Sequence, residues 1–254
     1  MIFKTIATSL LALSLLTACS ENNSSQSAKP QVEQAKDTTQ VVKNTMQGGK
    51  DYHSFANPEE VKVTHLDLDL TVDFSAKVLI GTAQVDFVRV DANATQLKLD
   101  TRDLAIETVT ANGEVINFEL AANDSFLGAA LSIDLPANVN SVEISYKTSA
   151  NASGVQWLTP EQTAGKKHPF LFTQAQAIHA RSFIPLQDSP QVRVTYQATI
   201  RTPKELLAVM SASNDPQTPR DGVYEFSMPQ PIPAYLIALA VGDLHFKSMG
   251  ERTG

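Results

Sequence analysis

Val61-Lys-Val-Thr-His-Leu-Asp-Leu-Asp-Leu-Thr-Val-Asp73 is the stretch that decides the fold class. From Leu66 to Val72, an aliphatic residue occupies every second position, and aspartate or threonine fills the positions between. Successive side chains of an extended strand point to opposite faces of a sheet. The alternation therefore predicts a strand with one face in the core and the other in water.

The same two-residue period recurs along most of the chain that follows. It is seen in the segments Ala83–Phe87, Leu97–Leu99, Ile116–Leu120, Leu131–Leu135, Val142–Tyr146, Val192–Ile200 and Tyr224–Met228. Tyr235–Val241 is a continuous apolar run that predicts a final buried strand, and Pro231 and Pro233 are expected to form a rigid lead into it. Asn112-Gly113 indicates a tight hairpin. Many short strands separated by turns predict an all-β fold, a sandwich or saddle-like assembly of mostly antiparallel sheets, with no long helix beyond the first 18 residues.

The first 18 residues are typical of a signal peptide. The apolar run Thr5–Leu16 is too short to cross a bilayer and suits the hydrophobic region of such a leader. Leu16-Thr17-Ala18-Cys19 resembles a bacterial lipobox, so we expect cleavage before Cys19 and lipidation of its thiol. The alternative is an ordinary leader with an incidental cysteine. Lipidation predicts a protein of the bacterial cell envelope that contacts the membrane through its anchor. Ser20 favours the periplasmic side of the outer membrane in a Gram-negative host.

Residues 19–50 are poor in apolar side chains and rich in Ser, Gln, Asn, Thr and Lys. Such a composition cannot bury enough surface to offset chain entropy, so we expect a disordered tether. The folded part is expected to span 51–254. Because Cys19 is the single cysteine, an intrachain disulfide is excluded and stability must come from the core.

Leu158–Gln191 lies between two groups of predicted strands and matches neither strand nor helix periodicity. It contains five glutamines and two histidines beside an arginine, and such side chains need hydrogen-bond partners when buried. A long polar segment held between strands is a common place for a binding site. We therefore take this stretch as the candidate functional region.

Most catalytic and nucleic-acid-binding functions are not indicated. A net charge of −7 argues against nucleic acid as a partner. Neither H-E-x-x-H nor G-x-S-x-G occurs, and no two of the five histidines are spaced i, i+4. His168 and His179 could converge with Glu161 on a metal, but their spacing does not require it. We predict no catalytic residue, metal or cofactor in this chain.

Asp67, Asp69 and Asp73 form an acidic row on the first predicted strand. Carboxylates in a row can bind calcium. The alternative is a solvated strand face, which the alternation with leucine favours.

The candidate region resembles the N-terminal domain of gluzincin zinc aminopeptidases, in the branch that contains leukotriene hydrolase and bacterial aminopeptidases. The resemblance covers about residues 54–253. Its motifs are Asn57-Pro58, Thr64–Leu68, Leu158–Thr163 (LTPEQT), Phe172–His179 (FTQAQAIH), Pro185–Pro190 (PLQDSP) and Pro231–Leu239 (PIPAYLIAL).

The resemblance implies a β-saddle that packs on a helical zinc domain. It also implies that Gln176 helps to bind the free amino group of a peptide substrate, with Gln174 lining the same pocket. A glutamine carbonyl can accept one ammonium hydrogen bond but attracts a cation less than a carboxylate does. For His179, Arg181, Gln187 and Asp188 we expect instead a structural role, satisfying buried backbone groups.

The family's zinc-binding and catalytic motifs are expected beyond the equivalent of Gly254, where the last sheet of this domain is still incomplete. We therefore expect a truncated enzyme: a substrate-binding domain without its zinc and inactive alone. The alternative is a free-standing β-sandwich module of the envelope that binds peptides or other proteins.

Overall fold

The computed structural model describes residues 49–215 and 217–250, so the predicted leader, Cys19 and nearly all of the predicted tether lie outside the described residues. Its largest element is a seven-stranded sheet with the order β13-β11-β1-β2-β8-β4-β5. The strands of this sheet are β1 (Val61–Asp73), β2 (Val78–Arg89), β4 (Ala105–Ala111), β5 (Glu114–Val115), β8 (Ser141–Lys147), β11 (Arg193–Arg201) and β13 (Val223–Pro233).

β1 is an interior strand of this sheet, and its alternation shows how the two faces differ. Leu66, Leu68, Leu70 and Val72 are buried, whereas the residues between them face solvent or are half-buried. β1 pairs antiparallel with β2 and parallel with β11. The prediction from its sequence pattern is confirmed. Burying the aliphatic face stabilises the fold, because each such side chain contributes about 1.5–3 kcal/mol.

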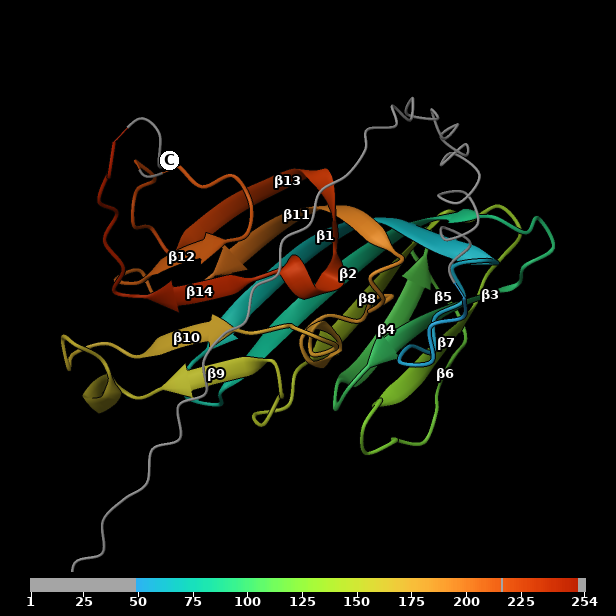
Figure 1. Cartoon of the computed structure of the whole chain (residues 1–254), viewed down its shortest axis with the longest axis horizontal. Coiled ribbons are helices and arrows are strands. Elements are labelled where there is room, and N and C mark those ends of the chain that lie inside the picture. Colours follow the sequence, from blue (N-terminus) through green and yellow to red (C-terminus); the bar gives the residue numbers. More distant parts are fainter. Residues whose placement is uncertain (1–48, 216, 251–254) are drawn as a thin grey trace, which may run out of the picture. The chain divides into compact units, whose positions relative to one another are not determined.

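Two smaller sheets flank the large one and are antiparallel throughout (Figure 1). One has four strands in the order β12-β14-β10-β9: β9 (Val155–Leu158), β10 (Phe170–Thr173), β12 (Leu207–Met210) and β14 (Leu239–Gly242). The other has three strands in the order β3-β7-β6: β3 (Gln96–Thr101), β6 (Phe118–Leu120) and β7 (Ala129–Asp134). A single hydrophobic core contacts all three sheets.

The expected all-β class with mostly antiparallel sheets is confirmed for the described residues, where the helical segments are three short 3-10 turns: η1 (Pro160–Gln162), η2 (Ala180–Ser182) and η3 (Ala234–Leu236). The predicted hairpin is also confirmed. Asn112 and Gly113 both have positive φ, 51° and 82°, and connect β4 to β5, as a tight turn with this handedness requires.

Two predictions about local structure are wrong. The stretch 158–191 is not free of strands, because it begins at the end of β9 and contains β10. A four-residue strand is too short to display a period. The run Tyr235–Val241 is not one buried strand: η3 occupies its start, Leu236 is exposed, and only the residues from Leu239 onward pair in a sheet.

The role expected for the two prolines is corrected as well. Pro231 and Pro233 lie inside β13 and do not lead into a final strand. β13 is an edge strand, where a residue without an N–H is tolerated because one side of the strand has no ladder partner. Pro233 then precedes η3 as its N-cap residue, so the chain turns there and does not continue straight.

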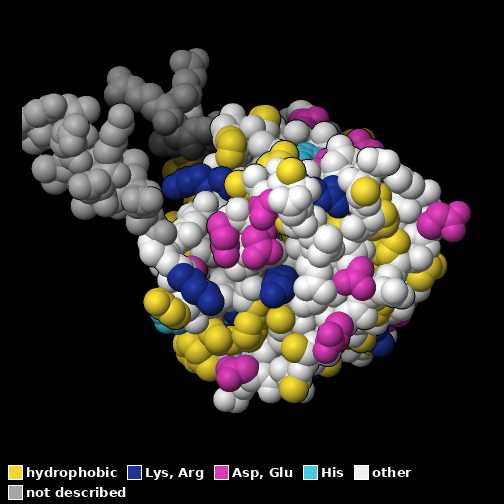
Figure 2. Space-filling view, turned by 90° about the vertical axis from the view of Figure 1, so that its right-hand side faces the viewer, with side chains coloured by type: hydrophobic (Ala, Val, Ile, Leu, Met, Phe, Trp, Pro, Cys, Tyr) yellow, Lys and Arg dark blue, Asp and Glu magenta, His cyan; other side chains and the backbone are white. Residues whose placement is uncertain are grey.

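The end of the molecule nearest β3, β6 and β7 displays acidic and basic side chains interspersed with apolar ones (Figure 2). Within the described residues, none of the helical segments has the length and hydrophobicity to cross a lipid bilayer.

Candidate functional site

The loop 174–179 connects β10 to η2 and carries both glutamines that the sequence singles out. Gln174 and Gln176 are exposed, whereas Ala175 between them is buried at 3% exposure. Ala175 therefore anchors the loop in the core and the two glutamines face outward. The Gln176–Ala177 peptide bond is cis.

Backbone hydrogen bonds fasten this loop at both ends. The Gln174 N–H donates to the Gly154 carbonyl at 2.8 Å, beside the start of β9. The His179 N–H donates to the Ala175 carbonyl at 2.8 Å and closes the loop on itself. The loop is thus a short closed turn on the sheet, and its exposed side chains project from a fixed backbone.

The two glutamines do not have equivalent surroundings. The side-chain carbonyl of Gln174 accepts the Gln176 N–H at 2.9 Å, so this group helps to shape the loop. Gln176 lines a cavity of about 820 Å³ together with Ile178 and Tyr235. The structure therefore places both predicted residues on one exposed loop and puts Gln176 at the cavity.

Other walls of this cavity come from parts of the chain that the sequence did not connect with the loop. They include Phe126, in the turn between β6 and β7, and Gly49–His53, which form the first part of the segment Gly49–Asn57, here called the strap. Tyr52 is 80% exposed and Phe126 is 62% exposed, so the cavity is rimmed by aromatic side chains. No local pattern marks these residues, because the contacts span long distances in sequence.

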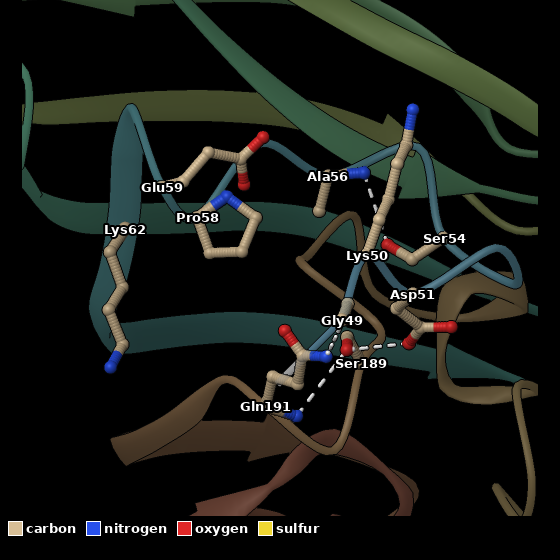
Figure 3. A pocket seen from close by; sticks show the side chains of 10 residues that line it. All are labelled: Gly49, Lys50, Asp51, Ser54, Ala56, Pro58, Glu59, Lys62, Ser189 and Gln191. Atoms are coloured by element: carbon tan, nitrogen blue, oxygen red, sulfur yellow. Dashed lines mark hydrogen bonds between the residues drawn. The ribbon is translucent and has the colours of Figure 1, made fainter. Parts of the chain in front are cut away.

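The strap is held by the segment that follows the candidate loop. Gln191 donates to the Gly49 carbonyl at 2.7 Å, and the Ser189 hydroxyl donates to the Asp51 carboxylate at 2.6 Å. Figure 3 shows these side chains in contact with the strap, and together they line a second cavity of about 470 Å³. Burial alone would raise the pKa of Asp51, but the hydrogen bonds from Ser189 and His53 outweigh it and lower this pKa, which keeps the carboxylate ionised.

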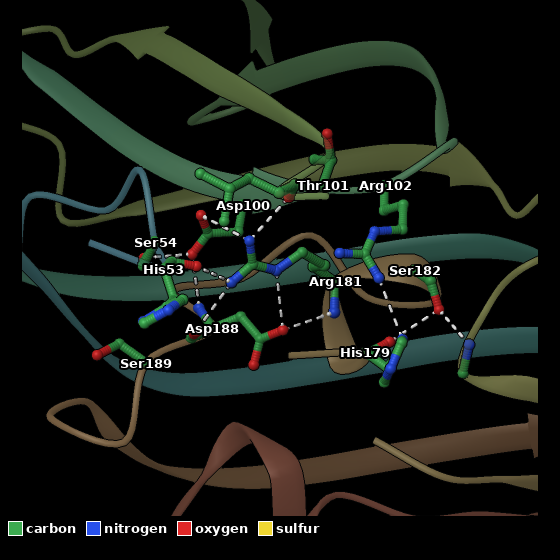
Figure 4. A network of polar contacts seen from close by, with 12 residues as sticks. His53, Ser54, Asp100, Thr101, Arg102, His179, Arg181, Ser182, Asp188 and Ser189 are labelled. Carbon is green, nitrogen blue, oxygen red and sulfur yellow. Dashed lines mark hydrogen bonds and ion pairs between the residues drawn. The ribbon is translucent and has the colours of Figure 1, made fainter. Parts of the chain in front are cut away.

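Beneath the loop, every residue from 180 to 189 is buried. Arg181 is the largest fully buried side chain. Its Nε donates to the Asp188 carboxylate at 3.0 Å, Nη1 to the Leu127 carbonyl at 2.8 Å, and Nη2 to the His53 carbonyl at 2.8 Å. Figure 4 shows this guanidinium at the centre of the polar network. The expected structural role of Arg181 is confirmed by these contacts.

Asp100 is the second carboxylate of the network. It accepts hydrogen bonds from the Ser54 hydroxyl at 2.6 Å and the Phe55 N–H at 2.7 Å, both on the strap, and from the Asp188 N–H at 2.9 Å. It lies 3.6 Å from Arg181 Nη1. Two buried carboxylates thus share one guanidinium.

The excess of two buried carboxylates over one guanidinium affects the pKa of Asp188. Burial raises the pKa of Asp188 to about 6, the charge of Arg181 opposes that rise, and the charge of Asp100 adds to it.

Gln187, the preceding residue, accepts the Val63 N–H at 3.0 Å and donates to the Val61 carbonyl at 2.8 Å. The structural roles expected for Gln187 and Asp188 are therefore confirmed.

His179 is half-buried beside Arg102 and Ser153. Its Nδ1 lies 3.1 Å from Arg102 Nη1 and 2.9 Å from the Ser153 hydroxyl. A guanidinium can only donate, so Nδ1 is the acceptor and the ring proton lies on Nε2. Burial and the charges of Arg102 and Arg181 lower the pKa of His179, which favours the neutral ring.

The two metal alternatives find no support among residues 49–215 and 217–250, where no group of three or more His, Cys, Asp or Glu side chains could hold a metal ion. Asp69 pairs with Arg201, and Asp73 accepts bonds from Ser75 and Ala76. The acidic row is thus a solvated strand face. The described residues do not fit zinc, and we assign no metal-dependent step to them.

Comparison with known proteins identifies the class of domain. The model of the Peptidase M1 N-terminal domain matches residues 62–236, which include the loop, Arg181 and Asp188. This chain belongs to that family.

Individual relatives agree with this assignment. The chain is 42% identical to a leukotriene A-4 hydrolase of Xenopus laevis over 213 residues, covering 80% of this chain and 35% of the relative. It is 38% identical to a leucine aminopeptidase 2 of Yarrowia lipolytica over 210 residues, covering 80% and 32%. The chain therefore spans about a third of the length of these relatives.

Solved structures show the same fold. A leukotriene A4 hydrolase from Saccharomyces cerevisiae superposes with a TM-score of 0.74 at 30% identity, covering 84% of this chain and 34% of that one. An M1 zinc metallopeptidase from Deinococcus radiodurans has a TM-score of 0.59 at 21% identity, covering 75% and 44%. At that identity the second likeness shows the fold alone.

Proposed function

We propose that this chain holds the free amino terminus of a peptide for a zinc aminopeptidase, with Gln176 as the hydrogen-bond acceptor. The observation that carries the proposal is the position of Gln176: an exposed amide at a cavity, on a loop whose backbone is hydrogen-bonded at both ends. The N-terminal-domain family and relatives named as aminopeptidases support it.

The chemistry of the two glutamines assigns them different parts. A peptide ammonium has three N–H donors, and the Gln176 carbonyl can accept one of them. The Gln174 carbonyl already accepts the Gln176 N–H, so its contribution is to hold the loop. Because Gln176 is neutral, it attracts the ammonium group only weakly. A carboxylate from another domain would strengthen the binding of that group.

The cleavage itself belongs to a different part of the enzyme. In this proposal a helical zinc domain would pack on this β-domain, and its metal would supply the Lewis-acid chemistry needed to polarise a peptide carbonyl and to activate water. The present chain alone is then expected to leave aminoacyl arylamides uncleaved, with or without added zinc. Hydrolysis by the purified chain that a chelator abolishes would contradict this division.

Amine binding can be tested on the chain itself by NMR, which detects weak association. Leucinamide is expected to shift the backbone amide resonances of the loop 174–179, which all variants retain, whereas N-acetyl-leucinamide, which lacks the ammonium, is not. Gln176→Ala should remove the response and Gln176→Glu should strengthen it.

The matched control is Gln156→Ala, which removes an exposed glutamine on β9 and should leave the response intact. Equal shifts from the free and the acetylated ligand would refute the assignment of Gln176.

We also propose that the protein is anchored to the envelope membrane through a lipid on Cys19. The lipobox-like sequence Leu16–Cys19 supports this, and several acyl chains give stable anchoring where one gives only reversible binding. Cys19→Ala should move the protein from the membrane fraction to the soluble fraction of the bacterial envelope. Unchanged fractionation of that variant would contradict lipid anchoring at this residue.

A further inference from the structure

We infer that Arg181 is a positioning residue for Gln176, and that it acts by tying the 174–179 loop and the N-terminal strap to one buried network. The inference rests on the amino-group-binding role proposed above and names a residue that makes that role possible. Arg181 itself is fully buried and cannot touch a substrate.

The side chain of Arg181 joins segments that no strand pairing joins. Its nitrogens bond to the turn between β6 and β7 through Leu127, to the strap through His53, and to the segment after η2 through both the carboxylate and the carbonyl of Asp188. A guanidinium is a planar fork with donors in fixed directions. The compact ammonium of a lysine cannot reach the same set of acceptors.

The backbone of Arg181 is fixed as firmly as its side chain. Its N–H donates to the Asp188 carboxylate at 3.2 Å, and its carbonyl accepts the Arg102 N–H at 2.9 Å. The C-terminal end of the loop is therefore held at this residue, which lies immediately after His179 and Ala180.

Hydrogen bonds connect the fixed backbone of Arg181 to the backbone near Gln176. The Ser182 hydroxyl donates to the His179 carbonyl and accepts the Gly154 N–H, both at 2.8 Å. The loop is closed by the bond from His179 to Ala175, next to Gln176. A shift of η2 must therefore move the loop, because little free chain lies between them.

The strap depends on the same network. None of its residues lies in a strand. Its first residues are bonded to Gln191 and Ser189, whereas its middle is held through His53 at Arg181 and through Ser54 and Phe55 at Asp100. Loosening Arg181 should therefore release the strap together with the loop, although the two are more than 100 residues apart in sequence. A packing defect confined to Arg181's immediate neighbours would not increase the mobility of the strap and the loop together.

The test is amide hydrogen exchange on the full chain, wild type against Arg181→Lys, combined with the leucinamide titration. We expect amides at 174–183 and at Phe55 to exchange at least about tenfold faster in the variant, while amides of the β1–β2 pairing keep their rates. The Gln176 response to leucinamide should weaken at least about threefold.

Tyr224→Phe is the matched control, because it removes a different buried hydrogen bond, from the Tyr224 hydroxyl to the Leu206 carbonyl at 2.6 Å. It should change neither the exchange of the loop nor the ligand response. If Arg181→Lys does not fold, Ser54→Ala, which deletes one bond to Asp100, should give the same paired loosening at smaller amplitude.

The outcomes separate the two proposals. A wild-type chain that does not respond to leucinamide refutes the function of Gln176, and with it the role of Arg181. A responding wild-type chain with an unaffected Arg181→Lys variant refutes only the role of Arg181. Loosening of the strap in Ser54→Ala without loosening of the loop also refutes it.

Discussion

Asp188 should bind a proton in the folded protein at a pH where the unfolded chain has already lost it. Burial raises the pKa of this carboxyl from 3.8 to about 6, although the Arg181 guanidinium opposes the rise. Between these two values the folded state binds more protons than the unfolded state. The free energy of unfolding must therefore fall as pH rises through this window and level off above it.

The magnitude follows from the two pKa values. The whole difference between 3.8 and about 6 corresponds to about 3 kcal/mol, at about 1.4 kcal/mol for each pH unit. Between pH 7.5 and pH 4.5 the part that is expressed is about 2 kcal/mol, because the unfolded carboxyl begins to titrate near the lower limit. Lower pH therefore stabilises the folded state through this residue, which is opposite to the usual effect of a carboxylate.

Asp188→Asn isolates this contribution, because asparagine has the same shape and does not titrate. We would measure urea unfolding of both proteins at pH 4.5, 6.0 and 7.5 through the fluorescence of Trp157, the single tryptophan. The stability of wild type relative to Asp188→Asn should increase by about 2 kcal/mol from pH 7.5 to pH 4.5. Asp67→Asn, on the exposed face of β1, should run parallel to wild type. Parallel curves for the two proteins, or a loss of wild-type stability relative to Asp188→Asn as the pH falls, would refute the proton uptake.

Three further substitutions test the packing around the loop and the core. Gly154→Ala should destabilise the fold by about 2 kcal/mol or more and accelerate exchange in the loop, because the new Cβ would lie 2.6 Å from the His179 carbonyl oxygen; an unchanged urea midpoint would contradict this. Tyr146→Phe should cost about 1–3 kcal/mol, since it leaves the buried Phe183 carbonyl without the hydroxyl that lies 2.9 Å away, and calorimetry should show a lower Tm. Leu68→Ala, on the fully buried face of β1, should cost about 2–5 kcal/mol in the same measurements, and a loss below 1 kcal/mol would argue against its central place in the core.

The sequence predicts the sheets well where the evidence is local. The alternation from Leu66 to Val72 needs only neighbouring residues to be recognised, and the hairpin at Asn112-Gly113 follows from the conformational freedom of two adjacent residues. β10 escapes the same reasoning because its four residues, including two phenylalanines, show no period. The run after Pro233 misleads because apolar composition alone does not distinguish a strand from a short turn of helix.

The candidate site is predictable only in part, for a related reason. The resemblance to the family singles out Gln174 and Gln176, and the structure places both on one exposed loop. The strap, however, enters the site through contacts such as Ser54 with Asp100 and Ser189 with Asp51, which span 46 and 138 residues. No window along the sequence contains both partners of such a pair, so their meeting could be found only from the fold.

The buried charges beneath the loop are better explained by the fixed geometry of their hydrogen bonds than by the stability that they add to the fold. Apolar side chains of similar volume often stabilise a core as well as a buried ion pair does, since removing charges from water is costly. Elsewhere in this protein, strand ladders fix the register of neighbouring segments, but the strap and the segment 180–189 have almost no ladder to align them. Hydrogen bonds to Arg181 and Asp100 have fixed lengths and angles, whereas apolar contacts permit sliding. The network therefore selects one arrangement of these irregular segments, and the amino-group binding proposed for Gln176 requires such a selection.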